Sequence, residues 1–119
     1  NLIKVITGVR RSGKSTIMEA FKNELIESGV AKQNITFLNF EERENLNLTE
    51  WSVLYDEIYK SVSVNKKHYV FLDEVQLVKD FEKLINEQGH IFEELLKLGE
   101  DKVLNLYQKS KKQKKYTTK

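Results

Sequence analysis

The chain has 119 residues, enough for one small domain with a hydrophobic core, and 39% of its residues are hydrophobic and 32% charged. It contains no cysteine, which excludes disulfides, thiol catalysis and cysteine-ligated zinc. No apolar run approaches the roughly 20 residues that span a bilayer, so we expect no membrane partner.

The first predicted element is a buried parallel strand over residues 2–7, a short apolar run without clean alternation. It leads into the segment Gly8–Ser15, which has the form G-x-x-x-x-G-K-S/T of a phosphate-binding loop, or P-loop. Residues 16–22 suit a helix. This motif requires a strand before it and a helix after it, so the flanking segments support the match.

Each residue type in this loop has a physical role. Glycine at positions 8 and 13 permits backbone angles and close approaches that a Cβ would obstruct, so that backbone N–H groups and the positive helix end can face an anion. Lys14 could reach the β- and γ-phosphates of ATP, and the Ser15 hydroxyl could bind Mg²⁺. The residues expected to surround the phosphates are Gly8, Val9, Arg10, Arg11, Ser12, Gly13, Lys14, Ser15 and Thr16.

The helix after the loop places Ile17, Phe21 and Leu25 on one face, and Gly29 suits the left-handed position that ends it. A second buried strand is predicted over residues 34–40. Acidic residues follow within the segment 41–44. They either face a nucleotide at the carboxyl end of the strand or form a solvated, charged loop.

A second helix is predicted to begin at a capping residue, either Thr49 or Ser52. Its apolar stripe indicates packing against a core, rather than a platform on which adenine stacks. The stripe consists of Trp51, Leu54, Tyr55, Ile58, Tyr59 and Val62.

The third predicted strand is the apolar run from His68 to Leu72, and two acids follow it directly. Asp73 then reaches the carboxyl edge of the sheet beside the P-loop, where a carboxylate can hold Mg²⁺, usually through its water shell. Glu74 is placed to orient or deprotonate an attacking water. His68 and His90 are isolated from each other, so we expect them to be structural or exposed and not metal ligands.

The C-terminal third has weaker signals. Asp80 is expected to cap a short helix over residues 81–86, and residues 91–98 suggest an amphipathic helix that ends at Gly99. The segment 102–107 is ambiguous between a strand and a helix. Residues 109–119 contain six lysines and no acidic residue. This composition is typical either of a solvated tail or of a segment that binds nucleic-acid phosphates.

Four strings of the chain resemble the prokaryotic AAA-like ATPases, in which an N-terminal ATPase core precedes a domain of unknown function. They lie at residues 6–16, 38–41, 70–76 and 81–85, so the resemblance covers residues 1 to about 86. It implies an α/β fold, a P-loop NTPase three-layer sandwich with a mostly parallel sheet. It also implies that Lys14 and Ser15 bind phosphate and Mg²⁺, that Asp73 supports Mg²⁺ and that Glu74 is catalytic.

The chain then departs from that family. The family continues into a strand that ends in a polar sensor residue and lies between the P-loop strand and the strand of Asp73. Without that strand, we expect two central strands to have unpaired inner edges, which are costly when buried. The chain is shortened, or Val103–Tyr107 supplies a substitute strand, or another chain supplies one. We prefer the first explanation.

These observations predict an ATPase core over residues 1–108, incomplete at its end, followed by a lysine-rich tail over 109–119. The expected function is Mg²⁺-dependent ATP hydrolysis, with Lys14 stabilising phosphoryl charge, coupled to an unknown partner or to a second copy of the chain. The alternatives are a module that binds nucleotide without hydrolysing it and a protein that binds nucleic acid through its tail. We expect a cytoplasmic location.

Overall fold

The computed structural model describes residues 3–8, 14–62 and 67–98. Strands and helices alternate along the chain, as expected for an α/β domain. In chain order they are β1 (Ile3–Gly8), α1 (Lys14–Glu27), η1 (Lys32–Asn34), β2 (Ile35–Asn39), η2 (Arg43–Leu48), α2 (Trp51–Lys60), β3 (His68–Asp73), η3 (Val75–Leu77), α3 (Glu82–Glu87) and β4 (Phe92–Leu98), where η marks a 3₁₀ turn.

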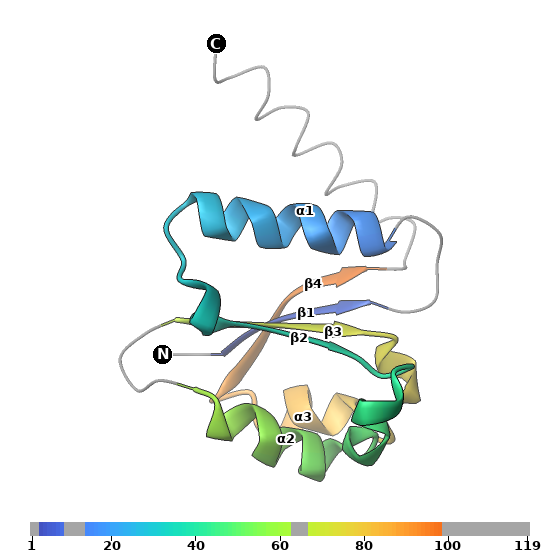
Figure 1. The fold of residues 1–119 in the computed structure, drawn as a ribbon. Helices are drawn as coiled ribbons and strands as arrows, with labels where there is room; N and C mark the ends of the chain where they lie inside the picture. Colours follow the sequence, from blue (N-terminus) through green and yellow to red (C-terminus); the bar gives the residue numbers. More distant parts are fainter. Residues whose placement is uncertain (1–2, 9–13, 63–66, 99–119) are drawn as a thin grey trace.

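The four strands form one parallel sheet in the order β2-β3-β1-β4. Helix α1 covers one face of this sheet, and α2 and α3 cover the other, which gives three layers (Figure 1). The predicted fold class, an α/β sandwich of the P-loop type around a parallel sheet, is therefore confirmed. None of the described helices is long and apolar enough to cross a membrane.

Two hydrophobic clusters hold the layers together, because successive strand residues point to opposite faces. Ile6 and Phe71 pack under α1 with Ile17 and Met18. Twelve buried residues form the larger cluster on the α2 and α3 face, among them Val5, and it includes residues of α2, α3 and all strands but β2. The apolar strand runs of the sequence therefore fill both faces of the sheet, as in parallel sheets generally.

The end of α1 follows the sequence prediction. Gly29 adopts φ +106°, in the left-handed region that glycine tolerates best. The N–H of Val30 donates to the carbonyl of Leu25 at 3.0 Å, and the N–H of Gly29 donates to the carbonyl of Ile26 at 3.1 Å. These two bonds form the Schellman motif that ends many helices.

The starts of the other helices differ from prediction. Neither Thr49 nor Ser52 caps α2, because the Glu50 side chain accepts the Ser52 and Val53 N–H groups instead. The side chain of Asp80 does not cap α3, because the residue in the N-cap position of this helix is Phe81. In the apolar stripe of α2, Leu54 and Ile58 are buried as expected, but Tyr59 remains 55% exposed.

The prediction of an amphipathic helix over residues 91–98 is wrong, because this segment forms β4 and pairs in parallel with β1. Three contacts fix the strand: the Ile3 N–H donates to the Ile91 carbonyl at 2.6 Å, Lys4 pairs with Glu93 and Thr7 bonds Glu94. Pairing with an open edge of β1 satisfies backbone groups at both strands, and this tertiary gain outweighs a helical pattern of apolar residues.

The unpaired inner edges expected in the sheet are also absent from its described strands. β1 pairs directly with β3, in a register that runs from Ile3 opposite His68 to Gly8 opposite Asp73. No strand lies between them, and β4 flanks β1 on its other side. The segment 103–107, considered as a substitute strand, lies outside the described residues, as does the tail over 109–119.

His68 is buried at the start of β3, with only 2% of its surface exposed. Its Nε2 lies 2.9 Å from the Thr36 hydroxyl, and its Nδ1 has no hydrogen-bond partner within the described part of the chain. Burial lowers the pKa of His68 below the ordinary value of 6.5 because the charged imidazolium loses its hydration.

We therefore expect the free energy of unfolding to fall as the pH drops below 6.5. In this range His68 binds a proton in the unfolded chain but stays neutral in the folded chain. The loss should stop once the pH passes the lower, folded pKa. Urea unfolding between about pH 8 and about pH 5 measures this effect. His68→Gln should remove it, whereas the exposed His90 provides the control His90→Gln, which should keep it. An equal pH dependence in His68→Gln and the wild type would contradict this explanation.

Candidate nucleotide-binding site

The carboxyl ends of the parallel strands meet at one edge of the sheet, at the right of Figure 1. Gly8 ends β1, Asp73 ends β3 and Asn39 ends β2, and Asp73 lies opposite both of the others in the strand registers. Helix α1 begins at Lys14, six residues after Gly8, at the same edge. Open α/β sheets bind ligands in this position, beyond the carboxyl ends of their strands.

Asp73 lies on the α1 side of the sheet. Phe71, two residues earlier on β3, packs edge-to-face on Phe21 of α1 with ring centroids 5.8 Å apart. Because strand residues i and i+2 share a face, Asp73 faces the same layer. Its side chain is only 4% exposed. A buried carboxylate therefore lies beside the end of β1 and on the face from which α1 starts.

Glu74 directly follows β3 and has unusual backbone geometry, with φ 60° and ψ 45° in the left-handed region. Few residues other than glycine adopt this conformation. The residue is 5% exposed, and its Oε1 accepts a hydrogen bond from the Gln76 Nε2 at 2.7 Å. Such backbone conformations gather at functional sites, where the surrounding structure holds them.

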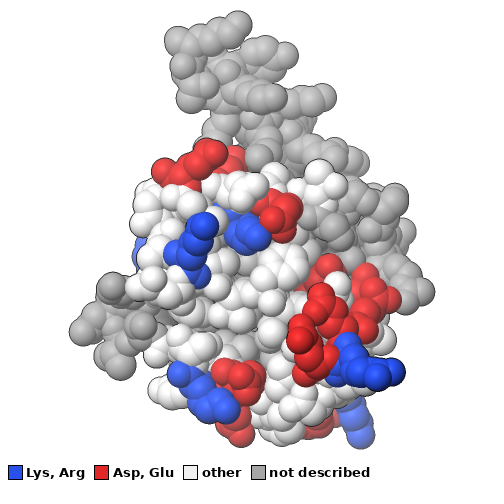
Figure 2. Space-filling model, viewed as in Figure 1, with Lys and Arg blue, Asp and Glu red and all other residues white. Residues whose placement is uncertain are grey.

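The acidic segment 41–44 after β2 is exposed. Of the two interpretations of this segment, a solvated, charged loop is therefore favoured over a group that faces a nucleotide. The pKa of Glu42 lies above its ordinary 4.5, first because its side chain shares a hydrogen bond with the nearby Glu44. Figure 2 shows acidic side chains gathered over the corner of the molecule where Figure 1 places η2.

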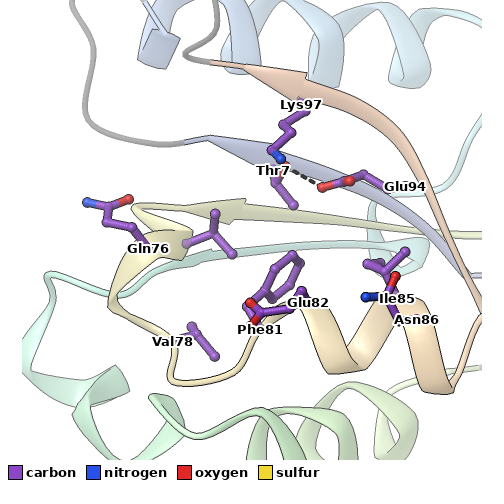
Figure 3. A pocket seen from close by; sticks show the side chains of 10 residues that line it. Thr7, Gln76, Val78, Phe81, Glu82, Ile85, Asn86, Glu94 and Lys97 are labelled. Carbon is purple, nitrogen blue, oxygen red and sulfur yellow. Dashed lines mark hydrogen bonds between the residues drawn. The ribbon is translucent and has the colours of Figure 1, made fainter.

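A cavity of about 350 Å³ lies on the other face of the sheet, between β1, β4 and the segment from η3 to α3 (Figure 3). The Thr7 hydroxyl donates to the Glu94 Oε2 at 2.7 Å on one side of it. Gln76, Glu82 and Lys97 also line the cavity. Sequence reasoning missed this feature, because Glu94 and Lys97 were expected on a helix and no local signal links them to Thr7.

The described residues bring together only part of the predicted site. Gly8, Asp73 and Glu74 meet at the carboxyl edge, Lys14 and Ser15 open α1, and the exposed Thr16 follows them. The loop residues Val9, Arg10, Arg11, Ser12 and Gly13 lie outside the described part of the chain. Within the described ranges, no group of three or more His, Cys, Asp or Glu side chains could hold a metal by itself.

Comparison with known proteins bears on this arrangement. A family model described as an AAA domain matches residues 1–98. The chain belongs to this AAA domain family. The match reaches the end of β4, so it extends beyond residue 86, where the resemblance read from the sequence stopped.

This AAA domain is similar in sequence to part of a longer bacterial protein. It is 38% identical over 89 residues to a protein of Haemophilus influenzae (strain Rd) that is named only as uncharacterized. The aligned part is 72% of this chain but only 22% of that relative, so the chain spans well under half of the longer protein. No solved structure matches the chain.

Proposed function

We propose that this AAA domain binds ATP with Mg²⁺ at the carboxyl edge of its sheet and hydrolyses it. The observation that carries the proposal is the register of Gly8 opposite Asp73, with α1 starting at Lys14 on the face that Asp73 shares. A phosphate-binding loop between Gly8 and Lys14 would then lie beside a buried carboxylate. Family membership supports nucleotide binding, and the finer steps are inferred from the residues.

The residues present fit the proposed ligands. Mg²⁺ prefers oxygen ligands and keeps several waters, so the carboxylate of Asp73 and the hydroxyl of Ser15 would suffice to hold it. The first turn of α1 offers backbone N–H groups and the positive end of a 14-residue helix to the phosphates. Lys14 adds a full positive charge at this end. When bound, Mg²⁺ would neutralise charge on the β- and γ-phosphate oxygens.

Glu74 would orient the attacking water. A base must lie near the reacting phosphate and stay ionised, and Glu74 follows the Mg²⁺-supporting Asp73 directly in the chain. The P-loop amides and Lys14 would stabilise the charge that develops on the transferred phosphoryl group. We further propose that hydrolysis drives a conformational change that is coupled to a partner or to a second copy of the chain.

Calorimetry and a phosphate-release assay test the proposal with the full 119-residue chain. We expect ATP to bind and phosphate to appear in the presence of Mg²⁺. Because the metal neutralises phosphate charge, removing it with EDTA should abolish phosphate release and weaken ATP binding. Calorimetry without any ATP binding at millimolar concentrations would rule out the proposal.

One observation favours a second candidate, a module that binds nucleotide without hydrolysing it. The sheet has no strand between β1 and β3, which is where the AAA-like resemblance puts a sensor residue. In that case ATP would bind, but phosphate release would remain at background. The same two assays therefore separate the candidates.

A further inference from the structure

Backbone hydrogen bonds in the turn after β3 fix the position of Glu74. The Leu77 N–H donates to the Glu74 carbonyl at 3.1 Å, and the Val78 N–H donates to the Val75 carbonyl at 3.0 Å. These bonds close η3 and bring the Gln76 side chain back toward Glu74. Together with the left-handed backbone of Glu74, they set the direction in which its side chain leaves the strand end.

Gln76 contributes a defined donor to this carboxylate. Its Nε2 lies 2.7 Å from the Glu74 Oε1, which is the length of a strong hydrogen bond to a charged acceptor. Glu74 is 5% exposed, whereas Gln76 is exposed. In Figure 3 the Gln76 side chain points away from the apolar residues Val78 and Phe81. Packing in the cavity therefore does not explain the direction of Gln76, but its bond to Glu74 does.

We propose that Gln76 is the positioning residue for Glu74, fixing the direction of its carboxylate through the bond from Nε2 to Oε1. A carboxylate that orients water must be correctly aimed at it. This inference rests on the proposed ATPase function, in which Glu74 acts on the water, and it assigns a role to a residue outside the pair Asp73 and Glu74.

The test compares Gln76→Ala and Gln76→Glu with the wild type and with Gln33→Glu. The control makes the same charge change at an exposed glutamine on η1. Both Gln76 variants should lower kcat for ATP about ten-fold, with KM changed by less than about two-fold, because positioning acts on the reacting geometry and not on binding.

A double variant tests whether Gln76 affects kcat through Glu74. In the Glu74→Gln background, Gln76→Ala should cause no further loss of kcat, since the group that it positions has already gone. Thermal unfolding midpoints of the Gln76 variants should match that of the wild type, because Gln76 lies on the surface. Additive losses in the double variant would overturn the proposal.

A readout without turnover separates this inference from the ATPase proposal. The side-chain amide signals of Gln76, identified by their loss in Gln76→Ala, should shift in Glu74→Gln, because the bond from Nε2 to the Glu74 Oε1 is changed. Unchanged amide signals overturn the positioning role, whatever the activity. If Glu74→Gln stops hydrolysis while the Gln76 variants keep kcat, only the positioning role fails. If Glu74→Gln hydrolyses ATP normally, the proposed role of Glu74 fails.

Discussion

Replacing Lys14 with alanine should weaken ATP binding by about 100-fold or more, which corresponds to about 3 kcal/mol. Lys14 is the first residue of α1, where the backbone N–H groups have no partner inside the helix. A lysine there could add charge-assisted hydrogen bonds to phosphate oxygens, each worth about 1.5–3 kcal/mol. Titration with ATP in a calorimeter, or with a fluorescent analogue, measures the loss.

The matched control is Lys22→Ala on the same helix. Lys22 lies two turns further along α1, where its Nζ pairs with Glu19 at 2.8 Å. Its removal should leave ATP affinity within about two-fold of the wild type, because a partly exposed pair of this kind contributes under about 1 kcal/mol to stability and none to the site. Wild-type ATP affinity in Lys14→Ala would remove the basis of the nucleotide proposal.

Replacing Glu74 with glutamine should lower the rate of phosphate release by at least about 100-fold, the lower limit of what general acid–base catalysis contributes. The amide has nearly the same shape but cannot accept a proton or orient water as strongly. ATP affinity should stay within about three-fold of the wild type, since binding energy and water activation reside in different groups. Single-turnover phosphate release and calorimetry measure the two quantities separately.

A glutamate away from the site provides the control. Glu87 is exposed at the end of α3, and Glu87→Gln should leave both the rate and the affinity unchanged. Equal, background-level release from the wild type and Glu74→Gln would favour the binding module without hydrolysis. Equal release well above background would show that Glu74 is not the group that activates water.

The strand order has a consequence for both proposals. In the AAA-like resemblance a sensor strand separates the P-loop strand from the strand of Asp73, whereas here β1 and β3 are neighbours and Gly8 lies opposite Asp73. Asp73 and Glu74 therefore lie one strand closer to Gly8 than the resemblance implies. Any sensing of the γ-phosphate within the described residues would have to come from groups already at this edge, such as Asn39.

Much of the candidate site could be predicted from the sequence because its signals are local. Short apolar runs predict the strand that ends at Gly8, the glycine-rich motif predicts the helix from Lys14, and charge at a strand end marks the acids Asp73 and Glu74 at the end of β3. Parallel strands bring their carboxyl ends to one edge, so the expectation that Asp73 lies at the same edge as Gly8 followed from strand direction alone. The Schellman motif at Gly29 was predictable for the same reason.

Three features required the tertiary structure. The apolar pattern of residues 91–98 fits both a helix and a strand, and the open edge of β1, with partners for Glu93 and Glu94, decided the outcome. The direct pairing of β1 with β3 depends on which strands meet, which no local pattern encodes. The bond from Gln76 to Glu74 depends on a left-handed backbone at a glutamate, a conformation that residue type disfavours. In this chain the local residue patterns determined the elements and the chemistry of the site, whereas long-range backbone pairing decided the order of the strands and the final strand.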